Sequence, residues 1–224
     1  MGEVIGELLP LAVGIAISPV PIIAVILMLF APDAKGASAG FLVGWIAGIM
    51  IATALFVWLA AVADLGGSGE PSALLSWVKL ILGVLLVVLA VKQWRGRPAP
   101  GAQADLPGWM TAIDRFTTGK ALTLGFALSA VNPKNLAMCV AAGIAVGTAG
   151  LDGGGIFVTV LIFTVLAACT VAVPVIAYAV AADRMRGPLQ DLKEWLQANN
   201  ATVMAVLLLV IGALLVGKGF GGLL

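Results

Sequence analysis

The sequence predicts an all-α integral membrane protein with six transmembrane helices, arranged as a 3+3 inverted repeat in which helices one and four are broken. Three observations support this prediction. Apolar residues make up 62% of the 224-residue chain and charged residues only 10%, against about 25% charged residues in an average soluble domain. Six apolar stretches are long enough to cross a bilayer. Two similar motifs recur half a chain apart.

The predicted spans are 17 to 29 residues long and mostly apolar, and a helix needs about 20 such residues to cross the hydrocarbon core. The stretches are residues 4–30, 39–63, 74–94, 121–149, 155–182 and 201–217. A segment rich in Pro, Gly and Ala, residues 95–107, separates the first three stretches from the last three. We therefore expect three parts: a first three-helix repeat at residues 1–100, a linker with an interfacial helix at 101–120, and a second three-helix repeat at 121–224.

The positively charged residues predict the orientation of the chain. Only Lys79 and Lys218 lie toward one side of the predicted bundle. Nine lie in or beside the predicted connections on the other side: Lys35, Lys92, Arg95, Arg97, Arg115, Lys120, Arg184, Arg186 and Lys193. Because Lys and Arg accumulate in cytoplasmic loops, we expect both termini outside the cytoplasmic membrane.

Composition also excludes several functions. The chain has no histidine, so His-based catalysis and His metal sites are excluded. A formal net charge of +1 argues against nucleic acid as a partner. The sequence offers no pair of a nucleophile and a general base, so we expect a protein that is not an enzyme and needs no cofactor or metal.

An internal repeat links the two halves of the chain. Gly14, Ala16, Ser18 and Val20 recur as Gly125, Ala127, Ser129 and Val131, at a constant offset of 111 residues. A proline follows in each copy. Pro21 comes directly after Val20, whereas Pro133 comes two residues after Val131. Three spans in each half would place the two copies in opposite orientations. This is the inverted-repeat architecture of many secondary transporters, whose sites form at broken helices near the membrane midplane.

Both copies of the motif predict a helix that breaks and restarts. Proline cannot donate to the helical hydrogen-bond ladder, and its ring clashes with the preceding turn. Ser18 before Pro19, and Asn132 before Pro133, are suitable N-caps for a new helix. A helix that starts at the midplane presents N–H groups and partial positive charge, which suits an anion. A plain proline kink in a packed bundle is the alternative.

Lys134 is the most informative charged residue, because it lies near the middle of an apolar run of 29 residues. An ammonium at the bilayer centre costs at least about 2.5–3.5 kcal/mol, and no acidic residue lies at mid-span as a partner. Alternatively, the span starts later and Lys134 extends toward the interface. We predict a substrate site at Ser18, Pro19, Pro21, Ser129, Asn132, Pro133, Lys134 and Asn135.

These motifs resemble a known group of transporters. Ser18-Pro19-Val20-Pro21 and Asn132-Pro133-Lys134-Asn135 resemble motifs of the LysE/RhtB exporter superfamily. The runs ISPVPIIAVILMLF, FLVGW and NPKNL, which start at Ile17, Phe41 and Asn132, are most similar to the GAP family, also called the sulfolipid-addressing proteins. Amino-acid exporters usually have Gly where this chain has Val20, which favours the GAP branch. The resemblance implies a bacterial cytoplasmic membrane and glycolipid traffic in the envelope.

Three functions follow as hypotheses. The first is outward translocation of a glycolipid or lipid-linked envelope intermediate. The second is export of a small amino-acid-like or organic anion. The third is a non-transporting role as the partner of a lipid-exporting or lipid-modifying complex. The expected partners are therefore membrane lipids and a lipid-like or small anionic substrate, with a homodimer or a lipid-export complex as further assemblies.

Overall fold

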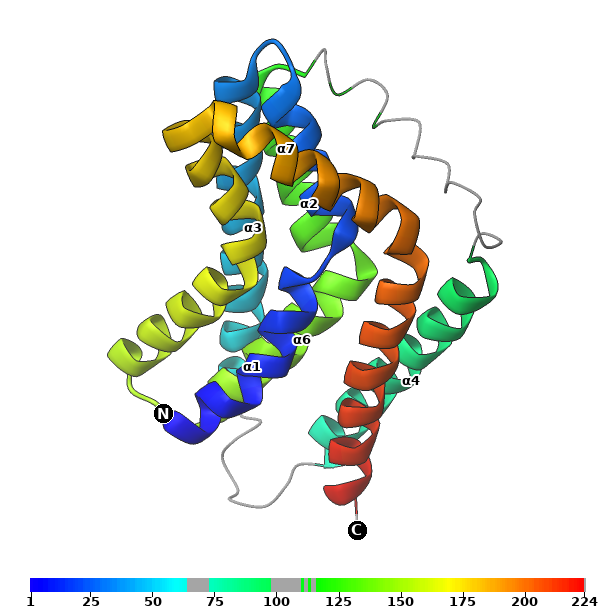
Figure 1. Cartoon of the computed structure of the whole chain (residues 1–224). Helices are drawn as coiled ribbons and strands as arrows, with labels where there is room; N and C mark the ends of the chain where they lie inside the picture. The colour runs from blue at the N-terminus through cyan, green and yellow to red at the C-terminus, as the bar shows by residue number, and fades with distance from the viewer. Residues whose placement is uncertain (64–72, 98–109, 111–112, 114–115, 224) are drawn as a thin grey trace.

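The computed structural model describes residues 1–63, 73–97, 110, 113 and 116–223, which fold into helices joined by short turns (Figure 1). No strand occurs within these residues, which confirms the all-α prediction. Most of the predicted linker and interfacial helix at residues 101–120 lies outside the described residues.

The first part of the chain contains one broken helix and two continuous ones. α1 (Gly2–Ala16) and α2 (Pro19–Phe30) meet at an angle of 52° across a two-residue break. Asp33 caps the next helix, α3 (Ala34–Val62), by accepting a hydrogen bond from the N–H of Gly36. α4 (Ala73–Arg95) follows after residues 64–72.

The second part repeats the broken helix and ends in a long bent one. α5 (Thr118–Phe126) continues into a π-helical turn, η2 (Ala127–Val131), and α6 (Pro133–Gly147) starts after Asn132. α7 (Gly153–Gly221) has a non-helical residue at Ala181. It rises along the bundle, turns across one end and returns, so its two apolar arms run in opposite directions (Figure 1).

The segmentation differs from the predicted one in two places. Predicted span four is divided at Asn132 into shorter apolar helices. Predicted spans five and six belong to one helical element, because residues 183–200 are mostly good helix formers and continue the helix through Pro188. By length and composition, α3, α4 and α7 each qualify as membrane spans, and α1 with α2 forms a fourth, bent one. The described residues thus contain three to four candidate spans.

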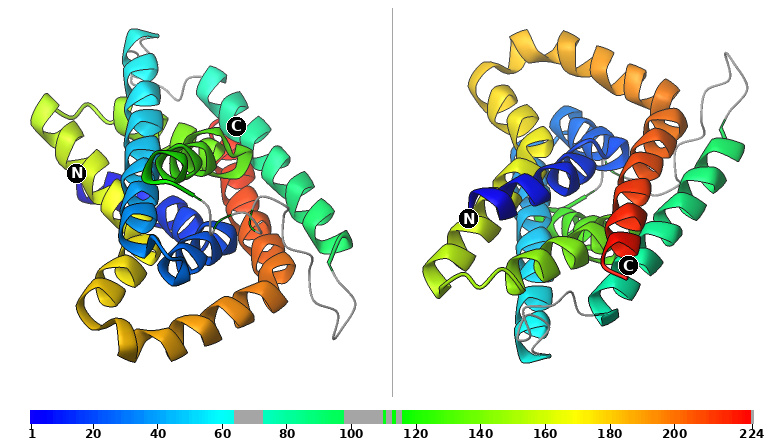
Figure 2. Two further views of the ribbon diagram at one scale, coloured as in Figure 1. Left: turned by 90° about the horizontal axis from the view of Figure 1, so that it is seen from above. Right: turned by 90° about the horizontal axis from the view of Figure 1, so that it is seen from below.

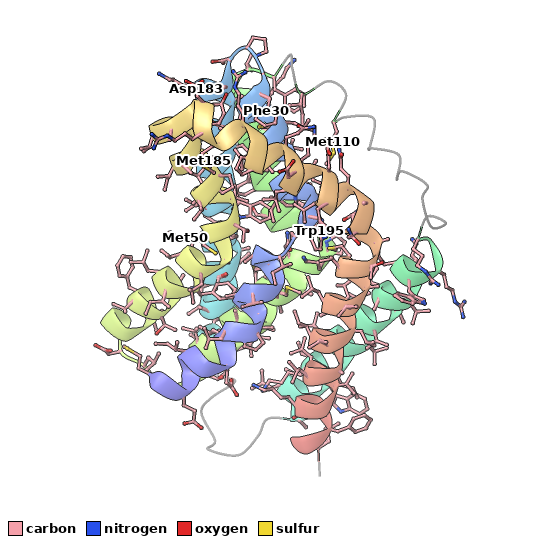
Figure 3. The ribbon with its side chains drawn as sticks, in the orientation of Figure 1. Phe30, Met50, Met110, Asp183, Met185 and Trp195 are labelled. Atoms are coloured by element: carbon pink, nitrogen blue, oxygen red, sulfur yellow. The ribbon has the colours of Figure 1, made fainter. Side chains whose placement is uncertain are left out.

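Charged groups divide the molecule into two ends. At the end with both termini, here the terminal end, Lys218 forms an ion pair with Glu7 at 2.7 Å (Figure 1). At the opposite end, here the basic end, the first turns of α3 and α5 meet, and these turns hold Lys35 and Lys120. The bend of α7 lies at the basic end too, where Figure 3 shows Asp183 near Phe30.

Small residues let the helices approach closely. Gly40 and Gly44 of α3 lie against the backbone of α5, and Gly48 lies against the Ser129 hydroxyl of η2. Farther along, α3 meets Gly143 and Gly147 of α6. The glycine stripes in the sequence therefore form packing surfaces within one chain. Gly83 and Gly212 join α4 to the second arm of α7 in the same way, and Figure 2 shows these two elements side by side.

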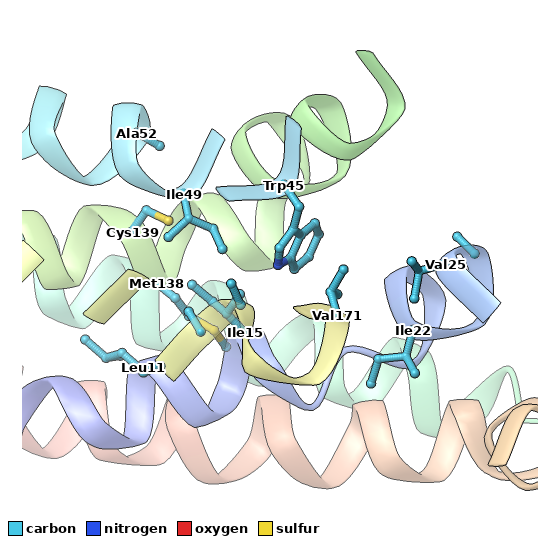
Figure 4. Close-up of a cluster of buried hydrophobic side chains, with 14 of the residues drawn as sticks. Leu11, Ile15, Ile22, Val25, Trp45, Ile49, Ala52, Met138, Cys139 and Val171 are labelled. Carbon is cyan, nitrogen blue, oxygen red and sulfur yellow. The ribbon is translucent and has the colours of Figure 1, made fainter. Parts of the chain in front are cut away.

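The apolar core lies where α1, α3, α6 and α7 meet. Figure 4 shows Ile15 of α1 and Met138 of α6 close to Trp45 and Ile49 of α3. All four side chains are fully buried. This core fixes the two broken helices relative to each other, because each contributes residues to it.

Gly44→Ala should destabilise the protein, because a Cβ at this position would overlap the carbonyl of Leu122 on the facing backbone. Overpacking of this kind costs about 1–3 kcal/mol, which lowers the melting temperature by roughly 2–12 °C in a chain of this size. Thermal unfolding of the purified protein in detergent measures the change. Gly119→Ala on α5 is the matched control, because a Cβ there has nothing within 4 Å. Equal melting temperatures for the two variants would contradict this account of the packing.

A buried lysine between two broken helices

The first break places Ser18 inside the protein. The backbone of Ser18 is extended (φ −86°, ψ 108°), and Pro19 starts α2. Only 3% of Ser18 is exposed. The prediction that its side chain caps α2 is wrong, because the hydroxyl makes no hydrogen bond to that helix. It instead accepts a hydrogen bond from the ammonium of Lys134.

The second break confirms its predicted capping chemistry. Asn132 is extended (φ −62°, ψ 121°), and its side-chain oxygen accepts a hydrogen bond from the N–H of Lys134 at 3.0 Å. Pro133 occupies the first turn of α6, where the missing N–H costs nothing. Both predicted breaks are therefore interruptions with extended backbone, and neither is a simple proline kink.

The π-helical turn η2 explains the extra residue in the second copy of the motif. The N–H of Asn132 donates to the carbonyl of Ala127, five residues earlier, at 3.2 Å. An α-helix would use the residue four positions earlier. The additional residue is thus contained in the wider turn, and the proline that follows is displaced by one position relative to the first copy. Such π-turns are frequent at functional sites.

Lys134 lies at the point where the two breaks meet. Its side chain is 4% exposed, so it does not extend to the molecular surface. The ammonium donates to the Ser18 hydroxyl and lies 3.9 Å from the Met204 sulfur. Within the described part of the chain, no carboxylate lies at ion-pair distance from it. A buried ammonium with three N–H donors therefore has one good acceptor and one weak one.

Asn135 connects the three segments around the lysine. Its side-chain oxygen lies 3.4 Å from the Ser18 hydroxyl, and its amide nitrogen donates to the carbonyl of Leu128 at 2.8 Å. The π-turn leaves that carbonyl without a helical partner, because the residue five positions later is Pro133. Asn135 thus satisfies a partly buried carbonyl and positions Ser18, and it is itself only 1% exposed.

The remaining predicted site residues lie elsewhere. The Ser129 hydroxyl is 3.0 Å from the carbonyls of both Gly125 and Phe126, in its own helix, and faces α3. Pro19 and Pro21 are buried in the first turn of α2. The structure brings together Ser18, Lys134 and Asn135, with Asn132 and Pro133 supporting the start of α6.

Two contacts to α7 complete the site. Thr170, in the first arm, donates to the carbonyl of Ala16 at the end of α1. Met204, in the second arm, contacts Lys134. Nothing in the sequence marks Met204, because it lies 70 residues away in an ordinary apolar stretch.

The positive charge of the site belongs mainly to the Lys134 side chain. The backbone contributes less than predicted, because Pro19, Pro21 and Pro133 have no N–H and the N–H of Lys134 is bonded to Asn132. The site is therefore suited to one anionic group that accepts hydrogen bonds from an ammonium.

Comparison with known proteins identifies the family. Residues 8–221 match the family described as Sap, sulfolipid-1-addressing protein. This chain belongs to that family. Comparison with curated proteins gives no match, and comparison with solved structures gives none either. The match covers both breaks of this Sap-family chain, and it confirms the sulfolipid-addressing resemblance that the motifs at Ser18 and Asn132 suggested.

Asn135→Leu should destabilise the protein, because the partly buried Leu128 carbonyl would lose its donor. A buried polar group left without a partner costs about 1–3 kcal/mol, and thermal unfolding in detergent measures the loss. Asn199→Leu is the control: it removes an amide that donates to the Trp195 carbonyl at an exposed position. Surface changes of this kind stay within about 0.5 kcal/mol. If the Asn135 variant melts at the wild-type temperature, the assignment of that carbonyl is wrong.

Proposed function

We propose that this protein transports an anionic glycolipid or lipid-linked envelope intermediate outward across the cytoplasmic membrane, with Lys134 binding the anionic group in transit. The proposal rests on one observation. A 4%-exposed lysine lies between two broken helices and has a hydroxyl, not a carboxylate, as its closest partner. Within a membrane, such a residue marks a substrate or ion pathway.

The position of Lys134 supports a site near the midplane. It lies close to the middle of residues 118–147, which span about 20 Å of helix on either side of the break at 1.5 Å per residue. The other break, at Ser18, lies between α1 of 15 residues and α2 of 12 residues. In secondary transporters, sites lie at such interruptions, where the two repeats meet.

The proposed topology has six passes. They are the bent pair α1–α2, then α3, α4, the bent unit of α5, η2 and α6, and finally the two arms of α7. The two bent units would then be the first passes of two inverted repeats, as in many secondary transporters. Membership of the LysE/RhtB superfamily is part of this proposal. The basic end would face the cytoplasm and the terminal end the outside, following the distribution of Lys and Arg.

The substrate class follows from the family and the site together. The family's description names a sulfolipid, a lipid whose polar part carries an anionic sulfur group. An anion bound at Lys134 would offset the cost of holding an ammonium in the bilayer, at least about 2.5–3.5 kcal/mol. An empty site would keep that cost, so the charge favours loading with an anionic substrate.

A second function is favoured by the polarity of the same cluster. Ser18, Lys134 and Asn135 together offer one charge and several hydrogen-bonding groups within a small volume. This set also fits the carboxylate of a small organic or amino-acid-like anion, which such a transporter would export.

Lys134→Gln should abolish transport, because glutamine keeps a hydrogen-bond donor but loses the charge that binds the anion. The measurement compares a deletion strain of the native host with strains that express wild-type or variant protein. Lipid extracts are resolved by membrane leaflet. We expect an anionic glycolipid to accumulate in the inner leaflet of the deletion strain, and the Lys134 variant to leave it there.

Lys193→Gln is the control, because it removes the same charge from the bend of α7 and should restore the wild-type profile. Equal amounts of each protein in the membrane are required for the comparison. If the lipid profile of the deletion strain is unchanged and a small anion is retained in the cytoplasm, the lipid-transport proposal is wrong and the second function is supported. Full restoration by the Lys134 variant would exclude the proposed role of the charge.

A further inference from the structure

A second site lies at the terminal end, in a cleft between α1, α4, α6 and α7 that does not include Lys134. Its volume is about 300 Å³, at the lower limit of ordinary ligand pockets, roughly 300–1,000 Å³. The inner wall is apolar and is formed by Leu11, Leu82, Ala141, Ile144, Ile211 and Leu215. The charged residues of the cleft are Glu3, Glu7, Lys79 and Lys218. These four define the rim.

Three helix faces connect this cleft to the buried lysine. On α6, Lys134, Met138, Ala141 and Ala145 follow one another at spacings of three and four residues, so they lie on one face. Leu11 and Gly14 lie three residues apart on one face of α1, which ends at Ala16, two residues before Ser18. In the second arm of α7, Ile211 lies two turns after Met204, which contacts the ammonium. The cleft and the lysine therefore share the same three helix faces.

One layer of side chains separates the cleft from Lys134. Gly14 has no side chain, and the space is filled by Met138 and Ile211, whose ends lie where a Cβ of residue 14 would be. Met138 is fully buried and Ile211 is 3% exposed. Figure 4 shows Met138 beside Leu11 and Ile15, and Leu11 also lines the cleft. The Met138 side chain is unbranched and flexible, whereas the β-branched Ile211 side chain is stiffer.

The rim carries two carboxylates, Glu3 and Glu7, and two ammonium groups, Lys79 and Lys218. Glu7 and Lys218 bond each other at 2.7 Å, which leaves neither fully available. Lys79 is partly buried. Among the described residues, no carboxylate lies within ion-pair distance of its ammonium. An anionic headgroup at the rim would therefore interact with Lys79 first. An acyl chain on the same molecule would reach the apolar inner wall.

We propose that this cleft binds one acyl chain of an anionic membrane lipid, with the headgroup at Lys79, and that it forms the terminal-end part of the route to Lys134. The second half of this statement rests on the proposed transport function, whereas the binding of the lipid does not. The volume fits part of one acyl chain and excludes a whole glycolipid. The cleft thus recognises the apolar part of the substrate, while Lys134 recognises its anionic group.

The test uses purified full-length protein in nanodiscs that contain phosphatidylglycerol with a diazirine on one acyl chain. After illumination, mass spectrometry of the peptides locates the labelled residues. We expect labelling at Leu11, Ile144 and Leu215 to exceed labelling at the exposed, lipid-facing Val84 of α4. Ala145→Trp should lower the labelling of the cleft several-fold, because the indole would occupy it from α6.

Ala54→Trp is the matched control, because Ala54 lies on an exposed face of α3 away from the cleft, and it should leave the labelling unchanged. Lys79→Gln should lower labelling by phosphatidylglycerol and leave labelling by phosphatidylcholine with the same acyl chain unaffected. Cleft labelling no higher than at Val84, or no effect of Ala145→Trp, would overturn the lipid site. If the Lys79 variant loses labelling by phosphatidylglycerol and by phosphatidylcholine equally, the assignment of the headgroup to Lys79 is wrong.

Lys134→Gln separates this inference from the proposed function, since Lys134 lies beyond the closing layer. We expect this variant to keep wild-type labelling of the cleft. If the cleft is labelled while the lipid profile of the deletion strain is unchanged, the lipid site stands and the transport proposal fails. If the cleft is not labelled while the lipid profile changes, transport stands and this site is wrong.

Discussion

The main physical constraint on this structure is that the Lys134 ammonium loses its hydration when it is buried between the helices. An intact α-helix offers no free backbone acceptor to a buried lysine, because every interior carbonyl is already used. Here the break between α1 and α2 supplies the Ser18 hydroxyl as an acceptor for the ammonium, and the Asn135 side chain in the first turn of α6 contacts that hydroxyl. The breaks and the lysine therefore require each other. An unbroken α1–α2 would leave the ammonium without its acceptor, and an apolar residue at 134 would leave the interruption without its donor.

The breaks create a second requirement, which is to satisfy the backbone groups that they release. The end of α1 is completed by Thr170 from α7, and the carbonyl released by the π-turn is completed by Asn135. Both hydrogen bonds come from short side chains, so the helices that they join must lie close together. The glycines of α3 that touch α5 and η2, together with Gly143 and Gly147 of α6 that touch α3, provide that closeness. The glycine packing and the polar site are consequently parts of one arrangement.

Much of this arrangement could be predicted, because the signals are local. Proline after a capping residue predicts a helix start, and a lone lysine in a long apolar run predicts a buried charge. The extra residue before Pro133 was visible in the sequence, but its meaning required the backbone, because a π-turn has no composition of its own. The Ser18 hydroxyl was assigned to the wrong partner, since its true partner is 116 residues away. The non-helical residue Ala181 lies next to the predicted end of span five at residue 182, whereas the helical path through residues 183–200 into span six was not predicted.

The identity of the lysine's partner determines what the site can do. A lysine paired with a carboxylate is already neutralised, and a substrate anion would have to compete with that carboxylate. A hydroxyl accepts a hydrogen bond but leaves the positive charge in place. Within the described part of the chain no carboxylate pairs with Lys134, so in the proposed function the complementary negative charge is that of the substrate. A soluble anion could supply it only by leaving water. An amphiphile already lies in the membrane, and its chain can gain contact with the apolar wall of the cleft along the same helix faces. Ala145 and Lys134 are 11 residues apart on α6, or about 16 Å. In the proposed function, one lipid molecule is therefore long enough to contact the cleft with its acyl chain and Lys134 with its anionic group.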